Sequence, residues 1–239
     1  MKKLFAAALL AISATMASAE ITGNLGLVSD YRFRGVSQTQ NAPAVQGGVD
    51  YSHASGFYAG NWNSSVSSQL YSTGAGVEND VYFGFRRRVA NNVTIDVGSM
   101  NYYYPRAVNG TTTDFNTNEV YVGAGLGDVV TARYSQSLGN YFGTANSKDS
   151  SYVQIDAAVP VASKVSLVGH IGRADVKNSA ALNYTDYNVG VSYDLSGWAV
   201  SARYYDNISQ GSGFQAANTV SGQQLYRNTT VVAVSRSFK

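Results

Sequence analysis

Apolar and polar residues alternate with a period of two along most of this chain. In residues 151–159, Val153, Ile155 and Val159 alternate with polar side chains, and residues 184–195 repeat the pattern. Successive side chains of a β-strand point to opposite faces, so this alternation predicts strands with one apolar and one polar face.

Twelve such segments follow one another along the chain. Each is close to the roughly 9–11 residues that a tilted strand needs to cross a bilayer. In order they are residues 21–32, 44–53, 57–67, 77–87, 93–103, 118–126, 129–138, 151–159, 165–173, 185–195, 198–206 and 227–238.

The links between these segments alternate in length. Five are tight turns, at residues 54–56, 88–92, 127–128, 160–164 and 196–197, and the others are long, at 33–43, 68–76, 104–117, 139–150, 174–184 and 207–226. Short turns at one end and long loops at the other are typical of outer-membrane barrels. The predicted fold is therefore all-β: a closed antiparallel transmembrane β-barrel of about 12 strands, with short periplasmic turns and long extracellular loops. A soluble periplasmic β-domain is the competing interpretation.

The amino-terminal segment differs from the rest of the chain. Two lysines are followed by the apolar run 4–12 and by small residues at Ala17 and Ala19. This order is typical of a cleavable secretory signal, and the apolar run is too short to span a bilayer. We predict a signal peptide over residues 1–19 and a barrel over residues 20–239, located in the outer membrane of a Gram-negative bacterium.

Composition narrows the possible partners. The chain has 17 basic and 15 acidic residues, and removal of the two signal lysines leaves 15 of each, a net charge of zero. A neutral chain disfavours a nucleic-acid partner. The absence of cysteine excludes a disulfide scaffold and thiolate metal sites.

A β-protein spans a bilayer only as a closed barrel, because every backbone polar group must be paired. The apolar face then contacts lipid, including lipopolysaccharide, and the polar face lines the interior. The pore-lining candidates are Asp30, Arg32, Asp50, Glu78, Asp80, Arg86, Asp96, Glu119, Arg133, Asp156, His170, Asp186, Asp194 and Arg203. Nine acids against four arginines and one histidine predict either a mildly cation-preferring aqueous pore or an interior filled by ion pairs.

Aromatic residues lie near many segment ends, where a membrane protein places interfacial belts. Tyr31 and Phe33 are candidates at the loop end, and Trp198 and Phe238 at the turn end. The last strand is also expected to contact the barrel-assembly machinery through Phe238, although Lys239 follows it.

The sequence offers little support for catalysis. It has two histidines, His53 at a turn and His170 on a polar face, and no spacing that pairs either with an activated nucleophile. No metal-ligand spacing or phosphate-binding loop is present. We therefore expect no enzyme activity and no cofactor. An outer-membrane enzyme centred on His170 remains as a hypothesis to test.

Four short motifs resemble the TorF family of porins: SDYRFRG at 29–35, SQTQ at 37–40, PAVQGG at 43–48 and GFYAG at 56–60. The resemblance extends over the mature chain and is weaker in the long loops. It implies an outer-membrane barrel with a transport role and carries no catalytic residues and no substrate. Within the motifs, Arg32 and Arg34 have the reach to meet Asp30 or Asp50. The first loop either folds inward and narrows the pore or lies on the surface.

The leading functional hypothesis is a porin-like channel for small hydrophilic solutes or ions. The alternative is a non-conducting barrel that acts as an adhesin or structural protein through its extracellular loops. The sequence fixes neither the solute nor the oligomeric state.

Overall fold

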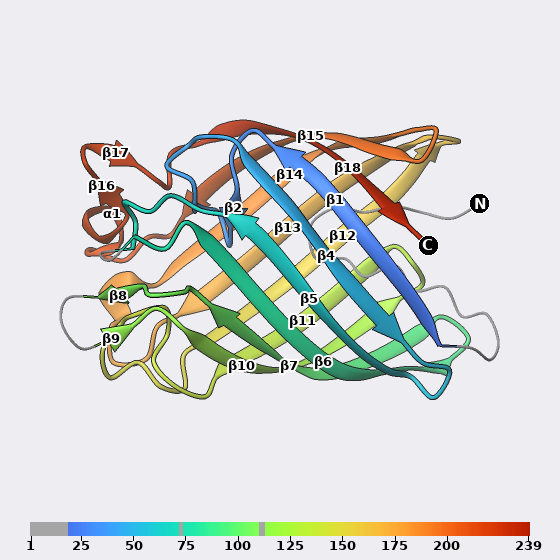
Figure 1. The fold of residues 1–239 in the computed structure, drawn as a ribbon, viewed down its shortest axis with the longest axis horizontal. Coiled ribbons are helices and arrows are strands. Elements are labelled where there is room, and N and C mark those ends of the chain that lie inside the picture. The colour runs from blue at the N-terminus through green and yellow to red at the C-terminus, as the bar shows by residue number, and fades with distance from the viewer. Residues whose placement is uncertain (1–18, 72–73, 110–112) are drawn as a thin grey trace.

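The computed structural model describes residues 19–71, 74–109 and 113–239. Within these residues, twelve antiparallel strands close into a barrel (Figure 1). They are β1 (Glu20–Val28), β4 (Ala44–Ser52), β5 (Phe57–Ser65), β6 (Val77–Ala90), β7 (Val93–Tyr103), β10 (Thr117–Leu126), β11 (Val130–Ser137), β12 (Ser151–Ala162), β13 (Val165–Asp175), β14 (Tyr184–Leu195), β15 (Trp198–Ile208) and β18 (Thr229–Phe238). The predicted fold class is confirmed. All but the last residue of the predicted signal lies outside the described residues.

Each strand pairs with its neighbour in the chain, and β1 closes the cylinder by pairing with β18. The register runs from Gly23 opposite Phe238 to Val28 opposite Ala233. Closure leaves no free sheet edge, so the barrel strands can pair their backbone groups with neighbours on both sides.

The links sort by length as the sequence predicts. Turns of two to four residues lie at one end of the barrel, and the long loops lie at the other (Figure 1). The long loops contain the small hairpins β2–β3 (Arg32–Phe33, Val36–Ser37), β8–β9 (Val108–Asn109, Thr113–Asp114) and β16–β17 (Thr219–Val220, Gln223–Gln224), a 3-10 turn at Ala180–Leu182 and helix α1 (Phe214–Ala217). Among the described residues, no helix is long and apolar enough to cross a membrane.

Three predicted strand ends differ from the structure by more than two residues. Strand β1 ends at Val28 instead of residue 32, because the chain turns into the barrel there. The predicted turns 88–92 and 160–164 shrink to two residues each, and irregular registers near Arg88 and Pro160 extend β6 and β12. Proline suggests a turn in the sequence, but a strand end with a bulge tolerates its missing N–H group.

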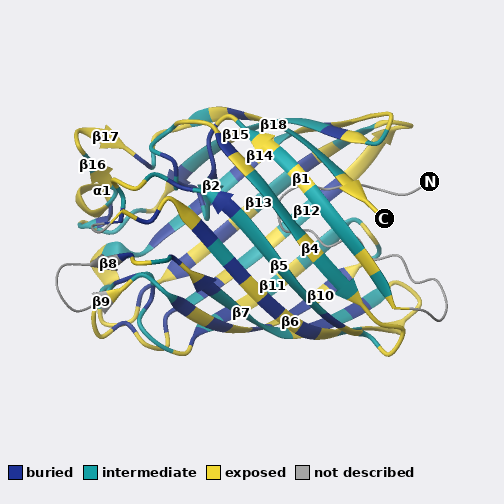
Figure 2. Ribbon diagram, in the orientation of Figure 1, coloured by how far each residue is buried: buried dark blue, intermediate teal, exposed yellow. Residues whose placement is uncertain are grey.

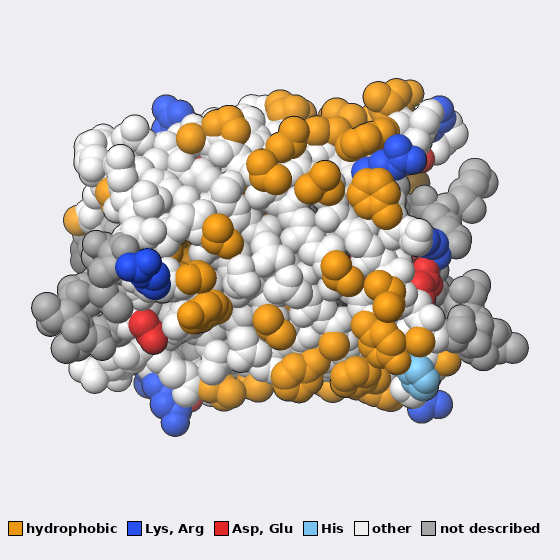
Figure 3. Space-filling model, in the orientation of Figure 1, with side chains coloured by type: hydrophobic (Ala, Val, Ile, Leu, Met, Phe, Trp, Pro, Cys, Tyr) orange, Lys and Arg blue, Asp and Glu red, His pale blue; other side chains and the backbone are white. Residues whose placement is uncertain are grey.

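Alternation along each strand divides the wall into two faces (Figure 2). Strand β10 shows this most clearly, since buried and exposed residues alternate along its whole length. The outward positions carry large apolar side chains, including Leu25, Phe83, Val122 and Ile155, each about half exposed. Hydrophobic side chains are scattered in clusters over the visible outer surface between the two ends of the barrel (Figure 3). The inward positions carry most of the polar and charged residues.

Candidate functional site

The candidate site is the lumen, and the structure places all fourteen candidates on inward positions of the wall or in the first loop. They form separate groups at different depths. Asp194 is at the turn-side rim, where it is exposed and its Oδ1 accepts a 2.8 Å hydrogen bond from the Gly197 backbone. Its contacts are those of a turn-capping residue.

The first group lies toward the turn end and is organised around Asp96. One carboxylate oxygen of Asp96 contacts Arg86 Nη2 at 2.7 Å and Arg133 Nη2 at 3.5 Å. The other accepts a 2.6 Å hydrogen bond from the Tyr58 hydroxyl. The Arg133 guanidinium carbon is 4.2 Å from the centre of the Tyr121 ring. Both guanidinium groups are thus held against the wall by one carboxylate and by aromatic faces.

Asp50 on β4 and Arg203 on β15 have no ion-pair partner within the described chain. Asp50 accepts a hydrogen bond from the Tyr82 hydroxyl. Arg203 Nη1 donates to Asn188 Oδ1 at 3.3 Å. Both side chains are only partly buried, although they point inward. Water therefore reaches the lumen at the positions of Asp50 and Arg203.

The second group is centred on His170. Its Nδ1 is 2.7 Å from Asp156 Oδ1, and its Nε2 is 3.1 Å from Asp186 Oδ2. The Tyr152 hydroxyl is 2.9 Å from the same Nε2 and donates to Asp186 Oδ1 at 2.7 Å. In the described structure the hydrogen-bond partners of His170 are Asp156, Asp186 and Tyr152, and none of them is a serine.

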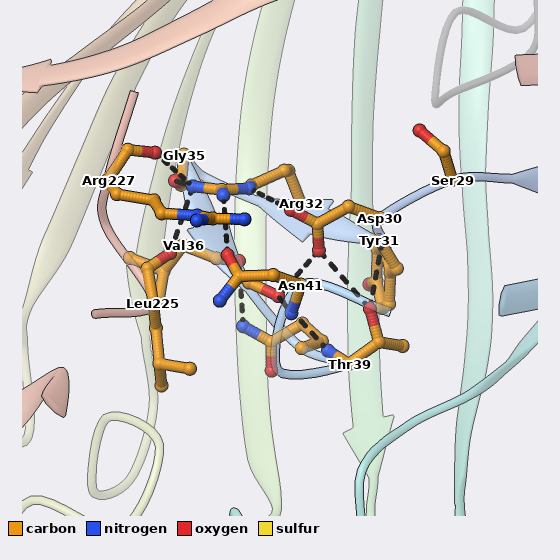
Figure 4. Close-up of polar contacts among 12 residues, drawn as sticks. Ser29, Asp30, Tyr31, Arg32, Gly35, Val36, Thr39, Asn41, Leu225 and Arg227 are labelled. Atoms are coloured by element: carbon orange, nitrogen blue, oxygen red, sulfur yellow. Dashed lines mark hydrogen bonds and ion pairs between the residues drawn. The ribbon is translucent and has the colours of Figure 1, made fainter. Parts of the chain in front are cut away.

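The third group is the first loop, residues 29–43, which folds into the barrel (Figure 4). Arg32 Nε is 2.6 Å from Asp30 Oδ2, as the sequence suggests. The same guanidinium donates to the backbone oxygens of Gly35, Leu225 and Arg227. The other Asp30 oxygen accepts from the Ser37 and Thr39 hydroxyls, at 2.5 and 3.2 Å. These bonds fix the base of the loop.

The tip of this loop is the tight turn between β2 and β3. Arg34 and Gly35 both have positive φ, +47° and +78°, as a two-residue type I′ hairpin requires. Arg34 donates to both oxygens of Glu119, at 2.8 and 2.7 Å, and to the Tyr141 hydroxyl at 2.9 Å. Its guanidinium carbon is 4.2 Å from the centre of the Tyr152 ring.

These contacts carry the loop across the lumen. Around the twelve-strand ring, β10, which carries Glu119, and β12, which carries Tyr152, are each five strands from β1 by the shorter route. Burial alone would lower the pKa of Arg34, but the adjacent Glu119 carboxylate outweighs it and raises that pKa well above its usual value. Arg34 therefore stays charged, and the bidentate ion pair bridges nearly opposite walls.

Two sequence-based expectations need correction here. Tyr31 and Phe33 are not in an interfacial belt. Tyr31 is 7% exposed. The ring of Phe33 packs edge-on against the rings of Tyr102 and Phe142, with ring centres about 5 Å apart. Neither Arg32 nor Arg34 pairs with Asp50. The candidates also omitted Arg34 and several inward tyrosines, among them Tyr58 and Tyr152. For the tyrosines, the inward positions in the alternation were the available signal, but tyrosine suits either face of a membrane barrel.

Closer to the loop end, Glu78 and Asp80 are almost completely enclosed, at 0% and 5% exposure. The Tyr104 hydroxyl donates to Glu78 Oε1 at 2.9 Å. Over the described ranges, no group of three or more His, Cys, Asp or Glu side chains is arranged as a metal site.

A closed antiparallel cylinder of twelve strands, with a polar interior crossed by a loop, has the architecture of outer-membrane porins. The chain belongs to the family Gcw_chp, described as bacterial protein of unknown function, whose family model matches residues 13–238.

Two solved structures show the likeness of the fold. The NanC porin in a rhombohedral crystal form aligns with a TM-score of 0.57 at 11% identity, covering 92% of this chain and 100% of the other. The KdgM porin in complex with disordered oligogalacturonate aligns with a TM-score of 0.53 at 12% identity, covering 93% and 100%. No curated protein matches the sequence.

Proposed function

We propose that this protein is an outer-membrane channel of the porin type, through which small hydrophilic solutes or ions diffuse. The observation that carries the proposal is the partial exposure of inward charged side chains: Arg86 and Arg133 retain 17% and 24% exposure inside the cylinder. Charges that line a wet passage set its selectivity, together with its width. We also propose that the chain belongs to the TorF family of porins and has the transport role which that resemblance implies.

The balance of charge favours cations. With every carboxyl group ionised, the inward groups described above comprise eight carboxylates, five arginines and His170, so the carboxylates exceed the bases by two even when the histidine is charged, and neutralisation of Glu78 and Asp80 would cancel this excess. They are Asp30, Asp50, Glu78, Asp80, Asp96, Glu119, Asp156 and Asp186 against Arg32, Arg34, Arg86, Arg133 and Arg203.

The purified protein should therefore conduct ions in planar bilayers, with a weak preference for K⁺ over Cl⁻ as long as Glu78 and Asp80 are ionised and bind no divalent cation. The measurement is the reversal potential across a KCl gradient, which should have the sign of a cation-selective pore. Protein that is folded, as shown by altered gel mobility before boiling, but silent at every voltage would contradict the channel.

The membrane location rests on the apolar exterior and has its own test on β12. Ile155 points outward and is 48% exposed, whereas its neighbour Gln154 points inward and donates to Asp156 at 2.6 Å. Ile155→Arg should lower the free energy of unfolding by about 2–4 kcal/mol in lipid vesicles, because arginine faces hydrocarbon. Gln154→Arg is the matched control and should change the free energy of unfolding little. Equal losses in urea titrations would argue against a lipid-facing exterior.

Export of the chain and assembly of the barrel in the outer membrane belong to the same proposed role. We infer that the signal is cleaved after Ala19, that lipid and lipopolysaccharide surround the apolar wall, and that the assembly machinery contacts β18. The protein acts without enzymatic chemistry and without a cofactor. The position of Phe238, exposed at the end of the strand that closes the barrel, supports the contact with the assembly machinery.

One observation favours the alternative of a non-conducting barrel. The Arg34–Glu119 ion pair spans the lumen, so the first loop obstructs part of the passage. If it closes the passage completely, the protein acts through its extracellular loops, as an adhesin or structural protein does. The bilayer measurement separates the two functions, and the removal of Arg34 shows whether the loop is the obstruction.

A further inference from the structure

We propose that Glu78 and Asp80 form the core of a binding site for one hard cation, such as Ca²⁺, inside the loop end of the barrel. The site is distinct from the diffusion of solutes, and the proposal does not depend on whether the lumen conducts. A cation bound there would link the long loops at this end of the barrel to strand β6.

The geometry of β6 brings the two carboxylates together. Glu78 and Asp80 are two residues apart on one strand, so both point to the same inward face. Neither side chain reaches bulk solvent to a significant extent, at 0% and 5% exposure. No donor group in the described part of the chain bonds to Glu78 Oε2 or Asp80 Oδ1, and the two carboxyl groups lie close enough to share a hydrogen bond with one another.

The two arginines of the first loop already have carboxylate partners. Arg34 gives both terminal nitrogens to Glu119, and Arg32 gives its Nε to Asp30. Across the described residues, no basic group lies within ion-pair distance of Glu78 or Asp80. Two enclosed carboxylates without compensation cost several kcal/mol each, so a cation or a proton must neutralise them.

The surrounding groups suit a hard cation. The Tyr104 hydroxyl bonds to Glu78, and Tyr71 stacks on Tyr104 with ring centres 4.7 Å apart. Carboxylate and hydroxyl oxygens, completed by carbonyls or water, are ligands for Ca²⁺, which takes about 6–8 oxygens. A soft or imidazole-seeking metal would find no suitable ligand among them.

The test is terbium luminescence in detergent micelles free of lipopolysaccharide. Tb³⁺ shares the oxygen preference of Ca²⁺, and the tyrosines around the site can transfer excitation to it. The wild-type protein should show emission that saturates at one ion per chain and that Ca²⁺ displaces. Glu78→Gln and Asp80→Asn should each weaken Tb³⁺ binding by at least about tenfold, because ligand charge sets affinity.

Asp194→Asn is the matched control, since it removes an acid from the opposite end of the barrel and should bind Tb³⁺ as the wild type does. A second measurement needs no variant: Ca²⁺ should raise the unfolding temperature of the wild type relative to EGTA, as any ligand of the folded state does. Wild-type emission no stronger than that of the Glu78→Gln/Asp80→Asn double variant, with no effect of Ca²⁺ on unfolding, would overturn the proposal in favour of a shared proton. A silent channel would leave these readouts unaffected.

Discussion

Arg34→Ala is expected to lower the free energy of unfolding by about 3–5 kcal/mol and to raise single-channel conductance. Removal of one partner of a buried ion pair leaves the other uncompensated, and Glu119 is 2% exposed. The substitution also removes the contact that holds the hairpin tip on the far wall, so the tip is free to leave the lumen. Urea titration in vesicles and planar-bilayer recording measure the two effects.

The double variant Arg34→Ala/Glu119→Gln separates the two effects. It removes both charges, so most of the lost stability should return, because no buried carboxylate remains unpaired. The conductance should stay high, because the hairpin still lacks its anchor. An Arg34→Ala variant with wild-type conductance and stability would show that this pair does not position the loop.

Gly35→Ala is the second substitution with a large expected effect. Its φ of +78° strains any residue with a Cβ, at a cost of about 1–2 kcal/mol. In addition, a Cβ would lie 2.6 Å from Asp186 Cβ and would meet the Asn207 amide. Overpacking of this kind costs about 1–3 kcal/mol more. The turn should shift away from β14 and β15, with a loss of stability in urea titrations and a change in conductance.

Gly222→Ala is its matched control. Gly222 has the same φ of +78°, but nothing lies within 4 Å of the position a Cβ would take. It should therefore show only the backbone strain, with unchanged conductance. Equal effects of the two substitutions would mean that the tip of the first loop is not packed against the wall.

These variants address the same physical question, which is how a narrow barrel limits passage. A barrel of eight strands is filled by its own side chains, and one of sixteen strands leaves a channel. Twelve strands lie between these limits, so a single loop across the lumen has a large influence on what passes. Here that loop is held at its base by Arg32 and at its tip by Arg34.

The alternation of apolar and polar residues determined which segments form the barrel wall and which side chains face outward. Side chains such as Val153 and Ile155 mark the outer face of a strand whatever its neighbours are, because the period of two is a local property of the extended chain. The lengths of the links determined which end each loop occupies, and closure follows because an open sheet cannot be paired in lipid. All twelve strands were accordingly predictable, with errors of more than two residues only at the two bulged ends and where β1 ends.

Only the tertiary structure decided what happens inside the cylinder. Alternation says that Glu119 points inward, but it does not say which residue meets it from across the lumen, and its partner Arg34 is 85 positions away. The same limit applies to Tyr31 and Phe33, which are inside rather than in an interfacial belt, and to Glu78 and Asp80, which have no basic partner. Contacts across a lumen depend on ring order and loop path, and neither leaves a periodic trace in the sequence.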